Sequence, residues 1–416
     1  MIAVTRQLWV LLHRYVGLVL TAFLIVVGLT GSLLAFLPEL NHIFTPQLFP
    51  PVQSGTPLKA AVLAERAQAL VPNALINGVN LGTPGTAIIN VIPGIDPSSG
   101  KLDSLVFNQL FLNPVTGNEL GHRMVGGLPD GLDNLMPFIY ELHDALALGE
   151  TGAWILGIVA VIWTIDCFVS LYLTLPIRRR KALLPAAFLP FARGRSKPWW
   201  QRWRPAWVVR WKASSYKLNF DLHRAGGLWL WAALLVFAWS SVGFNMKSVY
   251  VPVTQWLFDY PNPQSIWGMP TLDKPLQHPA IGWQKAQEIA ERLLTEQAQL
   301  HGFTVEQPVA LYLNRALGFY VYWVRSSLDI QDKGGGTVIA IDANTGEFKG
   351  LHLPTGQYSG KTVSQWLFML HMANVFGLPY RIFVCVLGLA IVMLSVTGII
   401  IWLRKRNVRR ILQPLG

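Results

Sequence analysis

Four long apolar segments constrain the fold of this chain more than any other feature of its sequence. Each is close to the length of about 20 residues that an α-helix needs to cross the hydrocarbon core of a bilayer. Only 13% of the 416 residues are charged, whereas a soluble protein carries about 25%. We therefore expect a membrane protein with four transmembrane helices. The segments are 8–37, 153–175, 228–246 and 381–403.

The first apolar segment has to be distinguished from a cleavable signal peptide. Residues 8–37 form a run of 30, whereas the apolar core of a signal peptide is roughly 7–15 residues long. The segment also contains His13, Arg14 and Tyr15, which a cleavable signal does not need. We expect it to be retained as a true span.

The distribution of charge predicts the orientation. Residues 176–221 hold 12 Lys and Arg against one acid, and the tail after Leu403 holds 5 against none. The long loops differ, because 38–152 hold 4 basic residues and 10 acids, and 247–370 hold 9 and 10. Loops rich in Lys and Arg stay in the cytoplasm. Both termini and the middle loop are therefore expected there, with the long loops in the periplasm and anionic lipid, not nucleic acid, as the partner of the basic loop.

The two halves of the chain resemble each other around four histidines. His13 lies in LHRYVGLVL and His223 in LHRAGGLWL, each at the start of a span that enters from the cytoplasm. His143, in ELHDALALGETG, and His371, in MLHMANVFGLPY, each precede a returning span. The repeat of the same features in the same order indicates a duplication.

The long loops each read as a small α+β domain. In both, a turn motif with Thr-Gly separates two short strands, FLNPVTGNELGHR at 111–123 and AIDANTGEFKGLH at 340–352. Asn, Asp and Gly tolerate the positive φ that such turns need. Apolar spacing predicts helices over 58–70 and 283–301. β-rich runs predict strands over 309–313, 319–325 and 338–342.

The hairpin that follows a helix resembles the PepSY domain, and the duplicated pattern with LHR at the span starts resembles the PepSY-associated transmembrane proteins over nearly the whole chain. Asn113 departs from the family pattern, which usually has Asp there. The resemblance implies a mainly α membrane protein, with a duplicated two-helix unit and two small α+β PepSY-like periplasmic domains. It also implies a haem-containing ferric-siderophore reductase of the bacterial inner membrane, a group with many iron-regulated members.

The expected boundaries follow from the spans and the loops. In each half of the chain a span is followed by a periplasmic domain, and then by a histidine helix joined to the returning span. The predicted parts are 1–37 (first span), 38–137 (first PepSY-like domain), 138–176 (histidine helix and second span), 177–221 (basic loop), 222–247 (third span), 248–360 (second PepSY-like domain), 361–404 (histidine helix and fourth span) and 405–416 (tail).

The four histidines are the candidate ligands of two haem b groups. His13 and His223 lie about one turn inside the cytoplasmic ends of their spans, and we call them the inner pair. His143 and His371 precede their spans by two to three turns, and we call them the outer pair. Ionisable residues at the membrane are functional candidates by default, and a haem between two helices takes one imidazole from each. A single such histidine is more often a packing residue, but four in symmetric positions favour metal ligation.

Glycines and arginines accompany the inner pair. Gly17 and Gly227 each follow their histidine by four residues, on the same helix face, where a missing side chain leaves room for a flat porphyrin. Arg14 and Arg224 follow the histidines directly. They could pair with haem propionates, or they could serve only the orientation of the spans, and the sequence does not decide between these readings.

Other polar residues carry weaker predictions. Asp166 lies alone in the second span, where a proton path, an ion pair with Arg14 or Arg224, or contact with water would explain it. His122 and His352 occupy similar places after the two hairpins and could meet substrate or metal, although two histidines make a weak metal site. The remaining histidines, His42, His278 and His301, lie in the outward loops.

The function predicted from these features is electron transfer from the cytoplasmic side to a periplasmic ferric siderophore, with release of Fe(II). No dinucleotide fingerprint or P-loop occurs, so the donor is expected to be a flavoprotein or a quinol. The basic, Trp-rich loop 178–217 could dock that donor, or it could lie on the membrane surface. Two rival functions stay open, a non-enzymatic PepSY sensor or regulator and an iron-chelate transport subunit, although unbroken spans argue against a transporter.

Overall fold

The computed structural model describes residues 2–94, 102–126, 131–177, 197–261 and 266–411. The chain divides into two compact units, which we describe separately. The first contains Met1–Ser32, His143–Lys247 and Phe383–Gly416, and the second contains Leu33–Leu142 and Ser248–Ile382.

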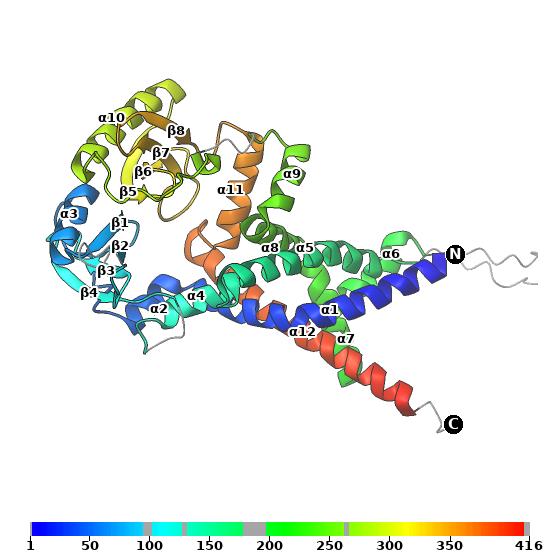
Figure 1. The fold of residues 1–416 in the computed structure, drawn as a ribbon. Helices are drawn as coiled ribbons and strands as arrows, with labels where there is room; N and C mark the ends of the chain where they lie inside the picture. Colours follow the sequence, from blue (N-terminus) through cyan, green and yellow to red (C-terminus); the bar gives the residue numbers. More distant parts are fainter. Residues whose placement is uncertain (1, 95–101, 127–130, 178–196, 262–265, 412–416) are drawn as a thin grey trace, which may run out of the picture. The chain divides into compact units, whose positions relative to one another are not determined.

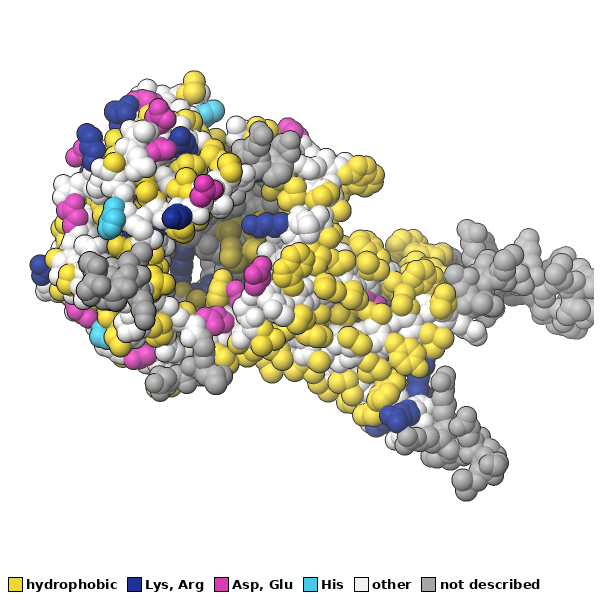
Figure 2. Space-filling view, viewed as in Figure 1, with side chains coloured by type: hydrophobic (Ala, Val, Ile, Leu, Met, Phe, Trp, Pro, Cys, Tyr) yellow, Lys and Arg dark blue, Asp and Glu magenta, His cyan; other side chains and the backbone are white. Residues whose placement is uncertain are grey.

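Long apolar helices build the first unit. Within the described residues, three helices are long and apolar enough to cross a membrane. Figure 2 shows hydrophobic side chains covering these helices, whereas charged side chains gather over the strands and helices of the second unit. The three are α1 (Ile2–Leu34), α5 (Gly149–Thr174) and α12 (Gly377–Ile411) (Figure 1).

The third apolar segment is broken, so the prediction of one continuous helix there is wrong. Helices α7 (Ser215–Trp229) and α8 (Trp231–Asn245) meet at Leu230 with a bend of 67°. Leu230 has φ −96° and ψ 1°, which lies outside the helical region. At 1.5 Å per residue the 15 residues of α8 span only about 22 Å. If the bent pair is counted as one span, the total is four. Unbroken spans were the argument against a transporter, and the break removes that argument.

Tryptophans hold the two sides of this bend. The indole N–H of Trp231 donates to the carbonyl of Cys167 in α5 at 2.8 Å, and that of Trp229 donates to the carbonyl of Trp207 at 3.1 Å. Trp207 ends a short turn after α6 (Trp199–Trp203). The bend is therefore fixed from both ends by side-chain hydrogen bonds. The basic cluster predicted at 178–181 lies outside the described residues.

Small residues let α1 and α12 approach closely. A Cβ at Gly28 would lie 2.9 Å from the carbonyl oxygen of Gly388, and one at Gly388 would overlap the Ser32 side chain. Ser32 Oγ donates to the carbonyls of Gly28 at 2.7 Å and of Cys385 at 3.0 Å. Close backbone approach of this kind is how helices associate in a bilayer, where the hydrophobic effect contributes little between them.

An eight-stranded antiparallel sheet forms the centre of the second unit. Its order is β4-β3-β2-β1-β5-β6-β7-β8, so each half of the duplication supplies four consecutive strands. The strands are β1 (Ala74–Asn80), β2 (Ala87–Pro93), β3 (Gln109–Leu112), β4 (Glu119–Arg123), β5 (Val305–Asn314), β6 (Phe319–Ser326), β7 (Thr337–Asp342) and β8 (Phe348–His352).

The two halves join edge to edge through β1 and β5. The pairing covers three residues on each strand, with Val79 opposite Leu311 at its centre. Gly78 faces Tyr312, and a Cβ at Gly78 would overlap the tyrosine ring. The sequence predicted two small domains and did not show how they pack, and in the structure their edge strands pair and produce one sheet. An unpaired edge strand invites association, and this pairing removes two such edges.

Two helices cover one face of the sheet. They are α3 (Ala60–Leu70) and α10 (Trp283–His301), the helices predicted over 58–70 and 283–301. Their small and apolar residues pack with alternate strand residues in one core. Gln287, which is 2% exposed, accepts a hydrogen bond from the N–H of Ala61 at 2.8 Å. The buried amide thus ties the first turn of α3 to α10.

The two hairpins are closed by the same side-chain turn. Asn113 Oδ1 accepts the N–H groups of Val115 and Thr116 at 2.9 and 3.0 Å. Asp342 Oδ1 accepts those of Asn344 and Thr345 at 2.9 and 3.0 Å. An amide oxygen therefore performs the turn-forming role of the carboxylate, and the departure at Asn113 leaves the hairpin intact.

The remaining helices of the second unit lie beside the sheet or lead to the spans. The Tyr250 hydroxyl of α9 donates to Ser364 of α11 at 2.8 Å, which holds these two helices together. Glu39 of α2 pairs with Arg381, and this hydrogen bond and charge lower the pKa of the Glu39 carboxyl. The bounds are α2 (Leu37–Phe44), α4 (Leu135–Ala145), α9 (Lys247–Leu257) and α11 (Ser359–His371).

Candidate cofactor site

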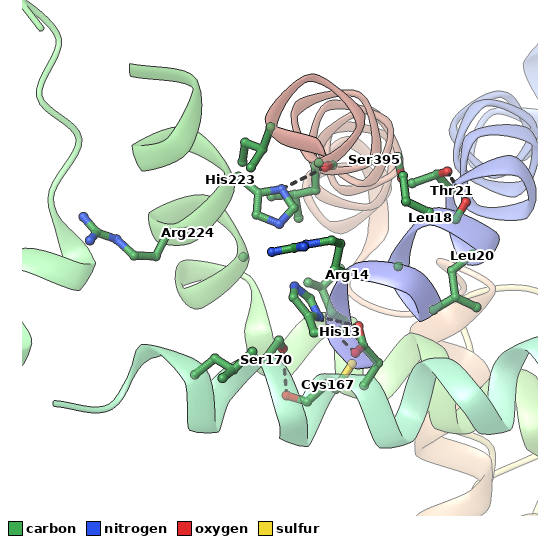
Figure 3. Close-up of a pocket in the computed structure, with 18 of the residues that line it drawn as sticks. His13, Arg14, Leu18, Leu20, Thr21, Cys167, Ser170, His223, Arg224 and Ser395 are labelled. Carbon is green, nitrogen blue, oxygen red and sulfur yellow. Dashed lines mark hydrogen bonds and ion pairs between the residues drawn. The ribbon is translucent and has the colours of Figure 1, made fainter. Parts of the chain in front are cut away.

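The inner pair of histidines meets inside the first unit. His13 on α1 and His223 on α7 face each other with ring centres 6.2 Å apart and ring planes tilted by 51°. Both line a cavity of about 440 Å³ between α1, α5, α7, α8 and α12 (Figure 3). The structure therefore brings together two residues that lie 210 positions apart in the sequence.

Each inner histidine is held by a hydrogen bond at Nδ1. For His13 the partner is Asp166 of α5, with both carboxylate oxygens at 3.0 Å from Nδ1. For His223 the partner is the carbonyl oxygen of Leu394 at 3.0 Å, and the Thr397 hydroxyl lies at 3.1 Å. A carboxylate and a carbonyl only accept, so both rings carry their proton on Nδ1. The lone pair is then on Nε2, which is the state of a metal-ligating histidine.

The partner of Asp166 is neither of the two arginines that the sequence suggested. Neither Arg14 nor Arg224 pairs with it, and His13 takes that place. The Asp166 residue is 9% exposed, inside an apolar helix. A carboxylate in such a place needs a hydrogen-bond donor, and the His13 ring provides one.

Glycines line the cavity, and one lies against the ring of His223. A Cβ at Gly17 would meet nothing within 4 Å, and one at Gly227 would meet only the end of Leu394 at 4.0 Å. Both glycines line the cavity. Gly398, which the sequence reasoning missed, lies directly against His223, with its ideal Cβ 3.2 Å from Cε1 of the ring.

The two arginines have different surroundings. Arg224 donates to Asp221 at 3.0 Å and to the carbonyl of Pro205, and its side chain points away from the two imidazoles in Figure 3. Asp221 is fully buried and also binds Arg210. Arg14 extends into the cavity in Figure 3, and it makes no hydrogen bond within the described part of the chain. Of the two, Arg14 remains the better candidate for an anionic group in the cavity.

The cavity fits a haem with two histidine ligands. With a metal–nitrogen bond of about 2.0 Å on each side, the ring centres of two imidazoles on one metal are about 6 Å apart. The 6.2 Å between His13 and His223 matches this separation. A volume of 440 Å³ lies within the range of roughly 300–1,000 Å³ of cofactor pockets. The free space beside Gly17 is where a flat macrocycle would extend.

The two outer histidines belong to different units, His143 to the first and His371 to the second. His143 on α4 packs against Gly31 of α1, whose ideal Cβ would lie 2.9 Å from its ring. Its Nδ1 forms a hydrogen bond of 3.0 Å with the Thr30 hydroxyl, which also lies 2.8 Å from the carbonyl oxygen of Val26. His371 ends α11. The pairing of these two histidines stays a prediction.

The turns that follow the outer histidines have unusual backbone conformations. Leu146 and Ala147 have φ of 54° and 53°, and Ala373 and Phe376 have φ of 51° and 60°. Positive φ is uncommon in residues other than glycine, and such residues gather at functional sites. Each histidine helix is therefore followed by a turn that contains two non-glycine residues in the left-handed region.

A loop of the sheet also holds the turn after His371. The Asp332 carboxylate accepts the N–H of Gly377, the first residue of α12, at 2.7 Å. The Asp332 N–H donates to the carbonyl of Asn374 at 2.8 Å, and the Asn374 side chain exchanges two hydrogen bonds with the backbone of Lys333. The β6–β7 loop thus caps the fourth span in the manner of an N-cap residue.

Thr-Gly dipeptides are the functional signal that the sequence reasoning missed. Thr30 and Gly31 receive the ring of His143, and Thr397 and Gly398 receive the ring of His223. In both, the hydroxyl lies at Nδ1 and the glycine makes room for the ring. A threonine followed by glycine inside an apolar span was a visible pattern, but only the fold shows which histidine it meets.

The histidines after the hairpins do not come together. His122 is in β4 and His352 is in β8, which are the opposite edges of the sheet. His122 stacks on Phe107 with ring centres 4.4 Å apart, and its Nδ1 lies 3.3 Å from Glu119. Burial, aided by Lys361, lowers the pKa of His352 to about 4. No group of three or more potential metal ligands from His, Cys, Asp and Glu occurs in the described parts of the chain.

Comparison with known families places the chain. The family model described as the PepSY-associated TM region matches residues 10–405. This chain belongs to the PepSY-associated transmembrane family. The family resemblance seen in the sequence is therefore confirmed, and with it the location in a membrane. A comparison with curated proteins gives no match to the chain.

Proposed function

We propose that this chain is a di-haem b-type reductase of the bacterial inner membrane that delivers electrons to a ferric siderophore in the periplasm. The observation that carries the proposal is the inner pair. His13 and His223 come from different helices and both line an apolar cavity, and the centres of their imidazole rings lie 6.2 Å apart. Two imidazole rings whose centres have this separation suit one iron with two axial histidines.

The chain's own residues would hold the cofactor and keep it dry. Haem, when bound, would supply a one-electron carrier that no side chain of this protein provides. His13 and His223 would present Nε2, because their Nδ1 atoms are occupied by Asp166 and Leu394. Apolar residues such as Leu20 and Leu234 would exclude water. The outer pair, His143 and His371, would hold a second haem.

The proposed reaction balances with one electron per iron. A quinol or a reduced flavoprotein is oxidised on the cytoplasmic side, and Fe(III) in the chelate becomes Fe(II). No covalent bond of the chelator breaks, because a chelator with hard oxygen ligands holds the ferric ion far more tightly than the ferrous one. The orientation that this requires, with both termini in the cytoplasm, rests on the excess of Lys and Arg in the middle loop and the tail.

A reoxidation assay tests the proposed function. The full-length protein is purified in detergent, reduced with dithionite, freed of excess reductant and mixed with a ferric hydroxamate under argon. We expect the reduced haem bands to disappear while an Fe(II)-specific dye forms its coloured complex in equal amount. The matched control is the same chelator loaded with Ga(III), which accepts no electron and should leave the bands unchanged.

Three outcomes separate this proposal from the rival functions. Equal amounts of reoxidised haem and Fe(II) support a reductase. Haem bands that persist with every ferric chelate tested would leave an electron carrier without this activity and contradict the proposal. A colourless protein from haem-sufficient cells would also contradict it, and would favour a sensor or regulator.

A further inference from the structure

The two inner histidines differ in the charge of the group behind them. Asp166 places both carboxylate oxygens 3.0 Å from Nδ1 of His13. His223 faces a neutral carbonyl, that of Leu394, and the hydroxyl of Thr397. In a chain built by duplication, two equivalent ligands would be expected to have equivalent partners. The charge behind His13 is therefore a feature of this site that symmetry does not require.

The carboxylate is costly in its position. Asp166 is 9% exposed and lies in the apolar helix α5, beside Cys167. A charged side chain inside a membrane segment is costly even on the lowest scales. An asparagine would make a similar hydrogen bond to His13 without that charge. The cost indicates that the charge itself has a role.

We propose that Asp166 is a positioning residue that lowers the reduction potential of the iron held by His13 and His223. This inference rests on the proposed function, because it requires a haem at the inner pair. A carboxylate that accepts the Nδ1–H of a ligating histidine makes the imidazole a stronger donor. A stronger donor favours the oxidised, more positive iron. The buried negative charge favours the same oxidation state directly, since the ferric site carries one more positive charge than the ferrous site.

The consequence is a bias in the direction of electron flow. The inner site, with Asp166 behind one ligand, would have a lower potential than the same site with two neutral partners. An electron would then leave it more readily for an acceptor of higher potential. A tenfold change in the ferric-to-ferrous equilibrium corresponds to 59 mV for a one-electron couple. Loss of a hydrogen-bond partner of a metal ligand typically costs 10–100-fold in metal affinity or activity, and we expect an effect of about tenfold on this equilibrium.

The test is a potentiometric titration of the full-length protein, followed in the haem absorption bands. The wave of the inner site is the one that His223→Ala removes. In Asp166→Asn we expect that wave to remain and its midpoint to rise by about 59 mV or more, a tenfold shift. Asp166→Glu, which restores the charge, should return the midpoint toward that of the unaltered protein. Thr397→Val, on the neutral side of the pair, is the matched control and should shift the midpoint by less than half as much.

The outcomes separate this inference from the proposed function. A colourless unaltered protein would overturn both. Haem at the inner site with the same midpoint in Asp166→Asn would overturn the inference and leave the proposed function standing. If Asp166→Asn folds but loses the haem, Asp166→Glu decides: an unchanged midpoint supports the role of the charge, and a raised midpoint or loss of haem contradicts it.

Discussion

The hydroxyl of Thr30 in α1 forms a hydrogen bond of 3.0 Å with Nδ1 of His143, which lies 113 residues further along the chain. The same hydroxyl lies 2.8 Å from the carbonyl oxygen of Val26 in its own helix. Thr30→Val keeps the shape of the side chain and removes the hydroxyl. We expect a loss of about 1 kcal/mol in stability and a changed spectrum of the outer site, measured by thermal denaturation and by absorption.

Thr164→Val is the control for that substitution. The Thr164 hydroxyl donates only within its own helix, to the carbonyl of Ala160 at 2.8 Å. Its loss should change stability by less than about 0.5 kcal/mol. Equal effects of Thr30→Val and Thr164→Val would show that the contact with His143 adds nothing.

Gly398 sets the position of His223. Its ideal Cβ would lie 3.2 Å from Cε1 of the ring, and the branches of a valine would come closer and displace the imidazole. Gly398→Val should therefore weaken haem binding at the inner site by on the order of tenfold or more, measured by haem titration of the purified protein. Gly226→Ala is the control, because its Cβ would meet only flexible side chains at 3.4 Å or more. Unchanged haem affinity in Gly398→Val would contradict the proposed position of the ligand.

Gly17 tests the cavity without disturbing either ligand. A Cβ there meets nothing within 4 Å, so Gly17→Leu should fold normally and place its side chain in the open space. We expect melting temperatures within about 2 °C of the unaltered protein, corresponding to a small change in stability. The amount of haem per polypeptide should fall by about half, because only the inner site is blocked. Full haem content in a folded Gly17→Leu protein would mean that the macrocycle lies elsewhere.

The joint between the two halves of the sheet depends on Gly78 and Tyr312. A side chain at Gly78 would overlap the tyrosine ring. Gly78→Ala should therefore destabilise the second unit by about 1–3 kcal/mol, as overpacking of a filled site does. In a double-mutant cycle, Tyr312→Ala should remove most of that penalty. Additive effects of the two substitutions, measured by thermal denaturation, would contradict the contact.

The lowered pKa of His352 leads us to expect a loss of stability in acid. Burial and the nearby Lys361 lower its pKa from 6.5 to about 4 in the folded protein. Between pH 4 and 6.5 the folded state therefore binds fewer protons than the unfolded state. Stability should therefore fall as the pH decreases from about 6.5 to 4, by up to about 3 kcal/mol. His352→Gln should flatten this part of the profile of stability against pH, and an unchanged slope would show that the residue titrates normally.

Local patterns in the sequence predicted the local structure well. The range 283–301 matches α10 at both ends, and the strands predicted at 319–325 and 338–342 match β6 and β7 to within one residue. Amphipathic spacing and turn residues depend on neighbours in sequence, so they can be read directly. The proximity of His13 and His223 could also be anticipated, because the repeated LHR motif places them at equivalent positions in two helices.

Features that depend on distant contacts could not be predicted. Asp166 meets His13 across 153 positions, and Thr397 meets His223 across 174. The break at Leu230 is held by hydrogen bonds of Trp229 and Trp231 to other segments. The composition of this segment alone predicts one continuous span, because it carries no sign of those contacts. The joining of β1 to β5 likewise depends on how two edges meet, which hydropathy does not encode.

The most direct test of the account is the haem content of the full-length protein with and without His223. The protein is purified from haem-sufficient cells, and the haem per polypeptide and the reduced-minus-oxidised spectrum are recorded. We predict two haems in the unaltered protein, one in His223→Ala, and two in His42→Ala, whose Nδ1 bonds to the carbonyl of Phe49 outside the cavity. Equal haem content in all three proteins, or haem in none of them, would contradict the assignment of His13 and His223 as ligands.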